Sequence, residues 1–268
     1  MRETAYAKLN LALHVRAREP GGYHRIETVF AFCEDGDALS VAAGDGLTLE
    51  VTGPFADGLA DPDNLVVRAA AALRDHYGVG GGASLRLTKI LPVAAGLGGG
   101  SADAAAALRL LVRWWELPEE PEILHGIARG LGADVPACIA SRTVRGEGRG
   151  DDLRPVAHDV AELRHVLLVN PRVPVATGPV FAAWDGVDRG ALAEDQLIGR
   201  NDLLAPALTI APVIGEVLDA LADSDVASMS GSGATCFGLF EDAAKCRAVA
   251  ARIAGDHPGW WTLQTCLR

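Results

Sequence analysis

The sequence predicts an α+β fold with two lobes, and three observations support this prediction. The first fifty residues break into short segments of β type, separated by glycine and aspartate. After them, segments of helix type and strand type are interleaved. Two glycine-rich turns, Gly96–Gly100 and Ser230–Gly233, lie far apart in the chain. We therefore place one lobe at 1–150 and a second at 151–268, with both turns facing a ligand cleft.

The opening strand is expected at Thr4–Arg18, where apolar and polar residues alternate. Alanine and leucine fall on one face, while Lys8, Asn10 and His14 fall on the other. A polar face of this kind either lines a cleft or is exposed to solvent, as most lysines are. Both interpretations stay open, although the chain has only three lysines, so one within an apolar strand is notable.

The remaining elements follow from apolar runs and the residues that bound them. Short apolar or β-branched runs predict strands at Ile26–Cys33, Leu39–Val41, Leu47–Val51, Ala83–Ile90, His165–Asn170, Val226–Met229, Ala234–Phe240 and Trp260–Leu267. Helical patterns predict helices at Leu65–Tyr77, Pro118–Leu131, Ala205–Leu221 and Asp242–Ala254, together with a long helix after the first glycine turn and a short one after Pro171. Asp63 or Asn64 is expected to cap the first of these helices, and Gly78 to end it. Val144–Gly150 is expected to form a tight basic turn.

The first glycine turn precedes an alanine-rich segment of high helix propensity, which indicates a phosphate-binding loop. Glycines let the backbone approach a ligand closely, and we expect Ser101 to be the N-cap of the helix. The predicted loop consists of Pro92, Val93, Ala94, Ala95, Gly96, Leu97, Gly98, Gly99, Gly100, Ser101 and Ala102. No lysine follows the glycines as in a Walker A loop, and the match to a dinucleotide-binding fingerprint is partial. A turn that merely joins a strand to a packed helix is the alternative.

A single acid, Asp134, stands in the apolar segment Ala133–Pro136. Aspartate is common at helix N-caps, and Pro136 is typical of a first helical turn. The pattern therefore fits a structural cap as well as a functional carboxylate.

The composition excludes several classes of partner. The formal net charge is −11, whereas nucleic acids and anionic membranes attract basic surfaces. The five cysteines are scattered and include no CxxC pair, which is typical of reduced thiols rather than of disulfides or a zinc site. No apolar run approaches the length of a membrane span. We expect a cytoplasmic protein that binds neither nucleic acid nor membrane; a monomer and a homodimer both remain open.

Taken together, the glycine-serine loop Pro92–Ala105 and the turn Ser230–Gly233 resemble those of the GHMP kinases, the superfamily of galactokinase, homoserine kinase and mevalonate kinase. Seven segments, sampling the chain from Ala5 to Phe237, are similar to those of one family within it, the 4-diphosphocytidyl-2-C-methyl-D-erythritol kinases of the non-mevalonate isoprenoid pathway. In chain order they are AYAKLNLALHV, GGYHRIETVF, LPVAAGLGGGSADAA, LGADVPACI, GRGDDL, NDLLAPA and MSGSGATCF.

This resemblance implies an enzyme that transfers the γ-phosphoryl group of ATP to the 2-hydroxyl of 4-diphosphocytidyl-2-C-methyl-D-erythritol. It implies a ribosomal-protein-S5-like N-terminal lobe, a ferredoxin-like C-terminal lobe and an active site in the cleft between them. The ATP phosphates would lie on the glycine loop. Lys8 and Asp134 would be the catalytic pair, with Asp134 accepting the hydroxyl proton and Lys8 stabilising negative charge.

The resemblance also implies a small-molecule substrate that carries a cytidine diphosphate group. The implied substrate-binding residues are Asn10, Tyr23, His24, Thr177, Phe181, Gly231 and Ser232. Aromatic faces can sandwich a pyrimidine, although Tyr23 and Phe181 are equally compatible with core packing.

Magnesium is implied as well, because phosphoryl transfer from ATP needs charge neutralisation. No acid aligns with the metal-binding glutamate of other superfamily members, so the metal ligands stay unassigned. Ala102 stands where serine is common in the family, which removes one hydroxyl near the phosphates or the metal.

Two other functions remain open. A kinase with a small acceptor, such as homoserine, mevalonate or a sugar, would not need the aromatic residues Tyr23 and Phe181. A nucleotide-binding module without catalysis would not need both Lys8 and Asp134.

Overall fold

The computed structural model describes residues 1–61, 63–156 and 163–268, and the chain forms two compact units. Unit 1 comprises Met1–Ala7, Asp35–Val93 and Gly98–Ser141, and unit 2 comprises Lys8–Glu34, Ala94–Leu97 and Arg142–Arg268. The units are discontinuous in sequence, whereas the predicted lobes, 1–150 and 151–268, are continuous. The reason is that two long strands, β1 (Arg2–Arg18) and β2 (His24–Ala42), contribute to both units. Residues 157–162 of the second predicted lobe lie outside the described residues.

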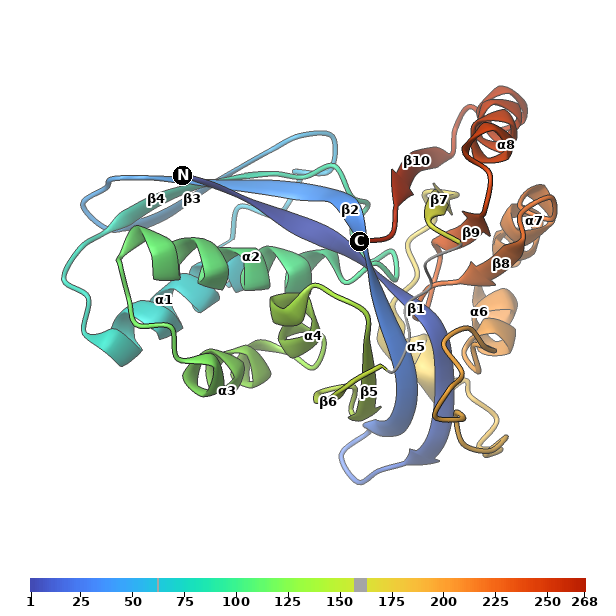
Figure 1. The fold of residues 1–268 in the computed structure, drawn as a ribbon, viewed down its shortest axis with the longest axis horizontal. Helices are drawn as coiled ribbons and strands as arrows, with labels where there is room; N and C mark the ends of the chain where they lie inside the picture. Colours follow the sequence, from blue (N-terminus) through green and yellow to red (C-terminus); the bar gives the residue numbers. More distant parts are fainter. Residues whose placement is uncertain (62, 157–162) are drawn as a thin grey trace. The chain divides into compact units, whose positions relative to one another are not determined.

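Unit 1 combines a small sheet with four helices (Figure 1). Strand β3 (Leu47–Thr52) runs parallel to β4 (Ala83–Thr88), and β4 pairs antiparallel with the second half of β2. The helices are α1 (Leu65–Tyr77), α2 (Gly99–Trp114), α3 (Pro121–Leu131) and α4 (Val135–Ala140). Helix α1 has its predicted bounds, because the Asn64 side chain accepts the Val66 N–H at 2.9 Å and Gly78 closes the helix in a left-handed conformation.

The main departure from the predicted strands of unit 1 is that β2 does not break after Cys33. Aspartate and glycine at 35–37 suggested a turn, but the strand continues to Ala42. Gly36 is needed for close packing instead, since a Cβ there would lie 1.9 Å from the Ala5 carbonyl oxygen. Asp37 is fully buried, so its carboxylate needs a charged or hydrogen-bonding partner in the interior and does not belong to an exposed turn.

Asp37 belongs to a buried group of three charges in unit 1. Lys89 Nζ donates to Asp37 Oδ2 at 2.5 Å and to Asp103 Oδ2 at 2.7 Å, and all three side chains are almost completely buried. Asp37 Oδ1 also accepts the backbone N–H groups of Ile90 and Leu91, which lead into the glycine loop. Burial raises the pKa of Asp103 to about 7, against the opposing effect of Lys89. The group thus joins β2 and the end of β4 to the second turn of α2.

Unit 2 contains a four-stranded antiparallel sheet in the order β10-β7-β9-β8. Its strands are β7 (His165–Asn170), β8 (Val226–Met229), β9 (Cys236–Phe240) and β10 (Trp261–Cys266), close to the predicted ranges. Helices α7 (Val213–Ala220) and α8 (Ala243–Asp256) pack on this sheet. Two further helices are α5 (Thr177–Ala182) and α6 (Leu204–Ile210). The predicted helix Ala205–Leu221 is therefore wrong as one element; it is two helices, separated at Ala211 and Pro212, because proline cannot continue the hydrogen bonding of α6.

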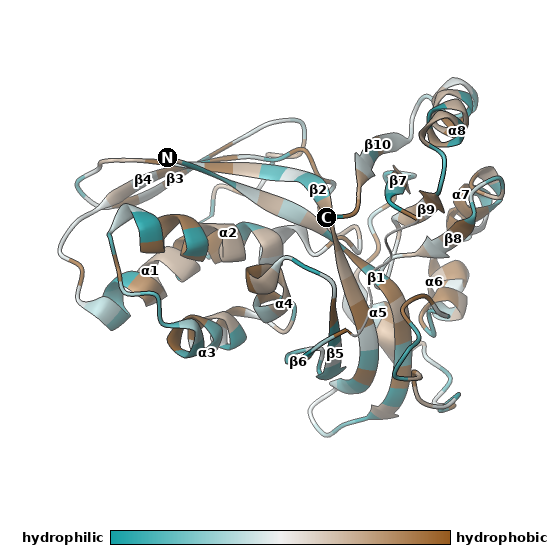
Figure 2. Cartoon of the chain, in the orientation of Figure 1, coloured by the Kyte–Doolittle hydropathy of each residue, from teal (hydrophilic) through white to brown (hydrophobic). Residues whose placement is uncertain are grey.

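The first half of β2 pairs in unit 2 with β5 (Val144–Gly148), which pairs in turn with β6 (Asp152–Pro155). Val144–Gly150 is thus mostly a strand rather than the predicted turn, and the turn is confined to its end. Figure 2 shows hydrophilic and hydrophobic residues alternating along β1. Leu13 and Val15 of this strand join Ile26, Val169 and Phe240 in the core of unit 2.

The two compact units, each with helices and a sheet, confirm the predicted α+β class. All five cysteines are free thiols, and four of them are buried. None of the helices within the described ranges combines the length and the apolar character needed to cross a bilayer.

Replacing Lys89 by methionine should strongly destabilise the protein, because it leaves Asp37 and Asp103 buried without their cation. We expect a loss of about 3–5 kcal/mol in the free energy of unfolding, measured by urea denaturation. Arg86→Ala on β4, three positions before Lys89, is the matched control. It removes a pair with Glu50 in which both side chains are more than half exposed, and it should cost less than about 1 kcal/mol. Equal losses in the two variants would contradict a structural role for the buried charges.

Candidate functional site

The glycine loop ends in an uncapped helix N-terminus. Helix α2 begins at Gly99, and its N-cap is Gly98, with φ 61°. The prediction that Ser101 is the N-cap is therefore wrong: the left-handed conformation of Gly98 starts the helix earlier, and Ser101 lies in its first turn. Among the described residues, no side chain forms a capping hydrogen bond with this N-terminus. The N–H groups of this turn and the positive end of the helix dipole are thus suited to bind an anion.

The middle of the same loop, Ala94–Leu97, packs in unit 2 against the second glycine turn. Ser230 Oγ donates to the Gly96 carbonyl at 2.8 Å, and the Thr235 N–H donates to the Ala95 carbonyl at 3.1 Å. A Cβ on Gly96 would lie 2.2 Å from the Ser230 carbonyl oxygen. Gly96 has φ 76° as well, so both its conformation and the close approach require glycine.

Lys8 lies beside this meeting point of the two turns. Its backbone N–H donates to the Leu97 carbonyl at 3.0 Å, and its ammonium donates to Asn10 Oδ1 at 2.8 Å. Only 3% of Lys8 is exposed, so the solvent-exposed alternative for this residue is wrong. Burying an ammonium is costly unless it is hydrogen-bonded, and Asn10 supplies one such bond.

Asn10 connects Lys8 to the second turn and to β2. Its side-chain amide donates to Thr28 Oγ1 at 2.8 Å, and its backbone N–H donates to Ser230 Oγ at 3.3 Å. Thr28 in turn donates to the Ala12 carbonyl at 2.6 Å. The orientation of the Asn10 amide is thereby fixed, with its oxygen toward the Lys8 ammonium.

The second glycine turn is held by two more side chains. Buried Asn201 donates to the carbonyls of Met229 and Gly231, both at 2.8 Å. Thr177, the first residue of α5, shares a hydrogen bond of 3.0 Å with Ser232. A Cβ on Gly231 would lie 3.1 Å from the Gly96 carbonyl oxygen, so this turn too is shaped by close backbone approach.

Asp134 belongs to unit 1 and directly precedes α4. It occupies the N-cap position of that helix, but its carboxylate makes no capping hydrogen bond. Its side chain is half-buried. Asp134 thus occupies the N-cap position without forming the capping hydrogen bond that its sequence position suggests.

An aromatic cluster in unit 2 brings together predicted substrate residues. The rings of His24 and Phe181 lie 5.0 Å apart, and His24 also meets buried Trp184 edge-on at 5.8 Å. Burial and, to a lesser extent, the neighbouring Arg18 lower the pKa of His24. Its Nε2 is buried without a partner among the described residues. Tyr23, by contrast, is 51% exposed.

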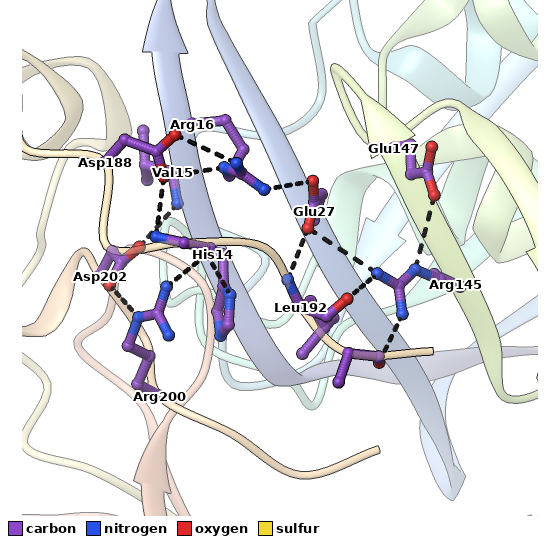
Figure 3. Close-up of polar contacts among 12 residues, drawn as sticks. His14, Val15, Arg16, Glu27, Arg145, Glu147, Asp188, Leu192, Arg200 and Asp202 are labelled. Atoms are coloured by element: carbon purple, nitrogen blue, oxygen red, sulfur yellow. Dashed lines mark hydrogen bonds and ion pairs between the residues drawn. The ribbon is translucent and has the colours of Figure 1, made fainter. Parts of the chain in front are cut away.

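The irregular segment 185–200 after this cluster is fastened by charged groups (Figure 3). Arg16 bridges Glu27 at 2.6 Å and Asp188 at 2.9 Å, and Glu27 accepts the Leu192 N–H at 2.6 Å. Arg145 donates to the carbonyls of Leu192 and, at 2.8 Å, Ala193. These arginines therefore serve to hold the chain.

The same segment covers His14, another member of the polar face of β1. Its Nδ1 lies 3.1 Å from the Gly190 carbonyl oxygen, and the ring is completely buried. Burial, followed by the nearby Arg200 guanidinium, lowers the pKa of His14. His14 thus lines no cleft.

Most predicted site residues fall in unit 2. The structure brings Lys8 to Asn10, Asn10 to Gly231, Thr177 to Ser232, and His24 to Phe181. Pro92, Val93, Gly98–Ala102 and Asp134 belong to unit 1. Sequence reasoning missed Thr28, Asn201 and the group around Lys89. An asparagine at the start of NDLLAPA was the only signal for Asn201.

Comparisons with known proteins identify the family of this chain. The model of the GHMP kinases N-terminal domain matches residues 64–142, and that of the GHMP kinases C-terminal domain matches 190–257. The 4-diphosphocytidyl-2-C-methyl-D-erythritol kinase of Sphingopyxis alaskensis is 54% identical, covering 100% of this chain and 99% of that protein. The enzyme of the same name from Rhizorhabdus wittichii is 53% identical, covering 99% and 94%. This chain belongs to the 4-diphosphocytidyl-2-C-methyl-D-erythritol kinase family.

Solved structures extend the similarity from sequence to fold. A crystal structure of 4-(cytidine 5'-diphospho)-2C-methyl-D-erythritol kinase matches with a TM-score of 0.84 and 31% identity, covering 100% of this chain and 99% of that one. Homoserine kinase from Cytophaga hutchinsonii matches with a TM-score of 0.69 at 16% identity, covering 99% and 95%, which shows a common fold alone. The predicted GHMP kinase fold is therefore confirmed, and the family is one of enzymes.

The residues of this family member offer limited means to hold a metal ion by themselves. Within the described ranges, no three His, Cys, Asp or Glu side chains are grouped to bind one. Magnesium bound to a nucleotide is commonly held by phosphates and water, with only one or two carboxylates from the protein. Such an ion therefore does not require a group of three protein ligands. The protein ligands stay unassigned.

Replacing Gly96 by alanine should separate the two glycine turns, because the added Cβ has no room and the left-handed backbone is strained. We expect a loss of more than about 2 kcal/mol in the free energy of unfolding. Gly80→Ala is the control, since that glycine is exposed and a Cβ there meets no atom within 4 Å. It should change stability by less than about 1 kcal/mol. Thermal melts of both variants provide the measurement, and an unaffected Gly96→Ala variant would refute the close approach.

Proposed function

We propose that this chain transfers the γ-phosphoryl group of ATP to the 2-hydroxyl of 4-diphosphocytidyl-2-C-methyl-D-erythritol. One observation carries the proposal: the chain is more than half identical, over its whole length, to curated kinases of that name. The burial of Lys8 beside two glycine turns supports it, because a cation near backbone donors suits a reaction on phosphate groups.

Asp134 is the proposed base and Lys8 its charge partner. Asp134 would accept the proton of the attacking hydroxyl, so that the new oxygen–phosphorus bond forms as the bond to ADP breaks. Its carboxylate is half-buried at the start of α4, which keeps it in one place on the fold. Lys8 would stabilise negative charge on the transferring group, and its hydrogen bond to Asn10 holds the ammonium in place.

The glycine loop, Pro92–Ala102, is the proposed site of the ATP phosphates. Its uncapped helix N-terminus offers backbone N–H donors, which a protein of net charge −11 needs for binding an anion. Magnesium would neutralise charge on those phosphates when bound with the nucleotide. Ala102 is buried within α2, so serine at this position is not needed to form the helix.

The cytidine group is proposed to bind at Tyr23, His24 and Phe181. The contact between the His24 and Phe181 rings and the exposure of Tyr23 support an aromatic binding surface for a planar base. The unpartnered Nε2 of His24 is suited to a hydrogen bond with a polar edge. Asn10, Thr177, Gly231 and Ser232 are proposed to contact the rest of the substrate.

The deciding experiment measures ADP release from MgATP by the purified protein with three acceptors offered separately. These are 4-diphosphocytidyl-2-C-methyl-D-erythritol, homoserine and mevalonate. We expect release with the cytidyl acceptor alone, together with a phosphorylated product. Release with homoserine or mevalonate instead would overturn the substrate, and ATP binding without release would leave a nucleotide-binding module.

Asp134→Asn tests the proposed base while keeping the shape of the side chain. We expect kcat to fall by about 10²–10⁴-fold, because the amide cannot accept the proton, with the KM for ATP changed less than threefold. Steady-state kinetics provide both values. Asp63→Asn, an exposed aspartate before α1, is the control and should leave both unchanged. A variant at position 134 with normal turnover would end the assignment.

A further inference from the structure

A tight turn between β5 and β6 carries Arg149 to Tyr23. Gly148 and Gly150 both have left-handed backbones, with φ 69° and 98°, and the Gly150 N–H donates to the Glu147 carbonyl at 2.9 Å. Gly148 is paired with Ile26 of β2, so the turn lies opposite the start of that strand. Tyr23 immediately precedes the first residue of β2, His24. The register of the sheet thus determines which side chains meet here.

The Arg149 guanidinium lies over the Tyr23 ring. Its central carbon is 3.7 Å from the ring centroid, which is a stacking distance for a cation on an aromatic face. Half of Tyr23 is exposed even with this neighbour in place. The contact therefore leaves much of the ring surface available to a ligand.

Arg149 differs from the other arginines around the aromatic cluster. Arg16 and Arg145 bind carboxylates or carbonyl groups of segment 185–200, and Arg18 donates to the carbonyls of Ala182 and Trp184. Within the described parts of the chain, Arg149 forms no salt bridge and no hydrogen bond of this kind. An exposed arginine without such a partner normally samples many rotamers, so the stack on Tyr23 is the contact that orders both side chains.

We propose that Arg149 is a positioning residue for base recognition: its guanidinium covers one face of Tyr23 and holds the ring so that the other face stacks on the pyrimidine. This inference rests on the proposed function, which assigns the cytidine group to Tyr23. Ordering the ring before binding reduces the entropy lost on binding. Arg149 would thereby favour cytidine ligands without touching the reacting groups.

Calorimetric titration of cytidine and of CDP tests the proposal in the full-length protein. Arg149→Ala should weaken binding of both ligands by about three- to tenfold, since a stacked cation contributes modestly and the ring loses its support. Arg149→Lys should not restore binding, because an ammonium lacks the planar stacking surface. The KM for ATP and the kcat at saturating acceptor should stay unchanged.

Tyr23 variants and a control complete the test. Tyr23→Ala should weaken binding, and adding Arg149→Ala to it should cause no further loss, because the two residues act as one unit. Arg154→Ala is the matched control; this half-exposed arginine on β6 pairs with Glu147 at 3.2 Å and should leave binding unchanged. Thermal melts check that each variant is folded.

The possible outcomes separate this inference from the proposed function. If the Arg149→Ala variant binds both ligands like the wild type, this inference is overturned and the proposed function is unaffected. If only CDP is weakened and lysine restores it, Arg149 contacts phosphate instead and the positioning role is wrong. If the wild type binds neither cytidine nor CDP, the assignment of the cytidine group fails, and this inference fails with it.

Discussion

The close approach of two backbones at Gly96 and Ser230 is the constraint on which the candidate site in unit 2 depends. It exists because Gly96 has no side chain, and one hydroxyl, Ser230 Oγ, joins the turns. The same hydroxyl accepts a hydrogen bond from the backbone N–H of Asn10. The side-chain oxygen of Asn10 in turn accepts a hydrogen bond from the Lys8 ammonium. A contact between two pieces of main chain thus determines where a buried cation lies, and the surrounding side chains secure that geometry.

Lysine is scarce in this protein, since only three of its 24 Lys and Arg residues are lysines. The net charge is −11, and two of the three lysines are buried, one within each unit. Lys89 pairs with two carboxylates and holds unit 1 together, and the ammonium of Lys8 donates to Asn10 beside the glycine turns.

Local sequence predicted most of what local interactions determine, although the helix break at Pro212 and the N-cap at Gly98 were missed. The bounds of α1 follow from its own capping residues, and β7 follows from its apolar run. Features set by distant contacts escaped prediction. Gly36 permits packing on Ala5 rather than a turn, and the pairing of Lys89 with Asp37 joins residues 52 positions apart. The family resemblance supplied candidate residues, but not Asn201 or Thr28, because these support the site through hydrogen bonds formed only in the folded chain.

The interleaving of the two units has a consequence for biosynthesis. Residues Lys8–Glu34 belong to unit 2, and the isolated bridge between Cys33 and Leu267 joins positions 234 residues apart in sequence, counted as 267 − 33. The Arg268 N–H likewise donates to the Phe32 carbonyl at 3.0 Å. These contacts of Phe32 and Cys33 therefore form only after residues 267 and 268 have left the ribosome. Until then unit 2 is incomplete, and incompletely packed intermediates favour aggregation, so unit 2 is the part of a nascent chain that a chaperone would have most reason to shield.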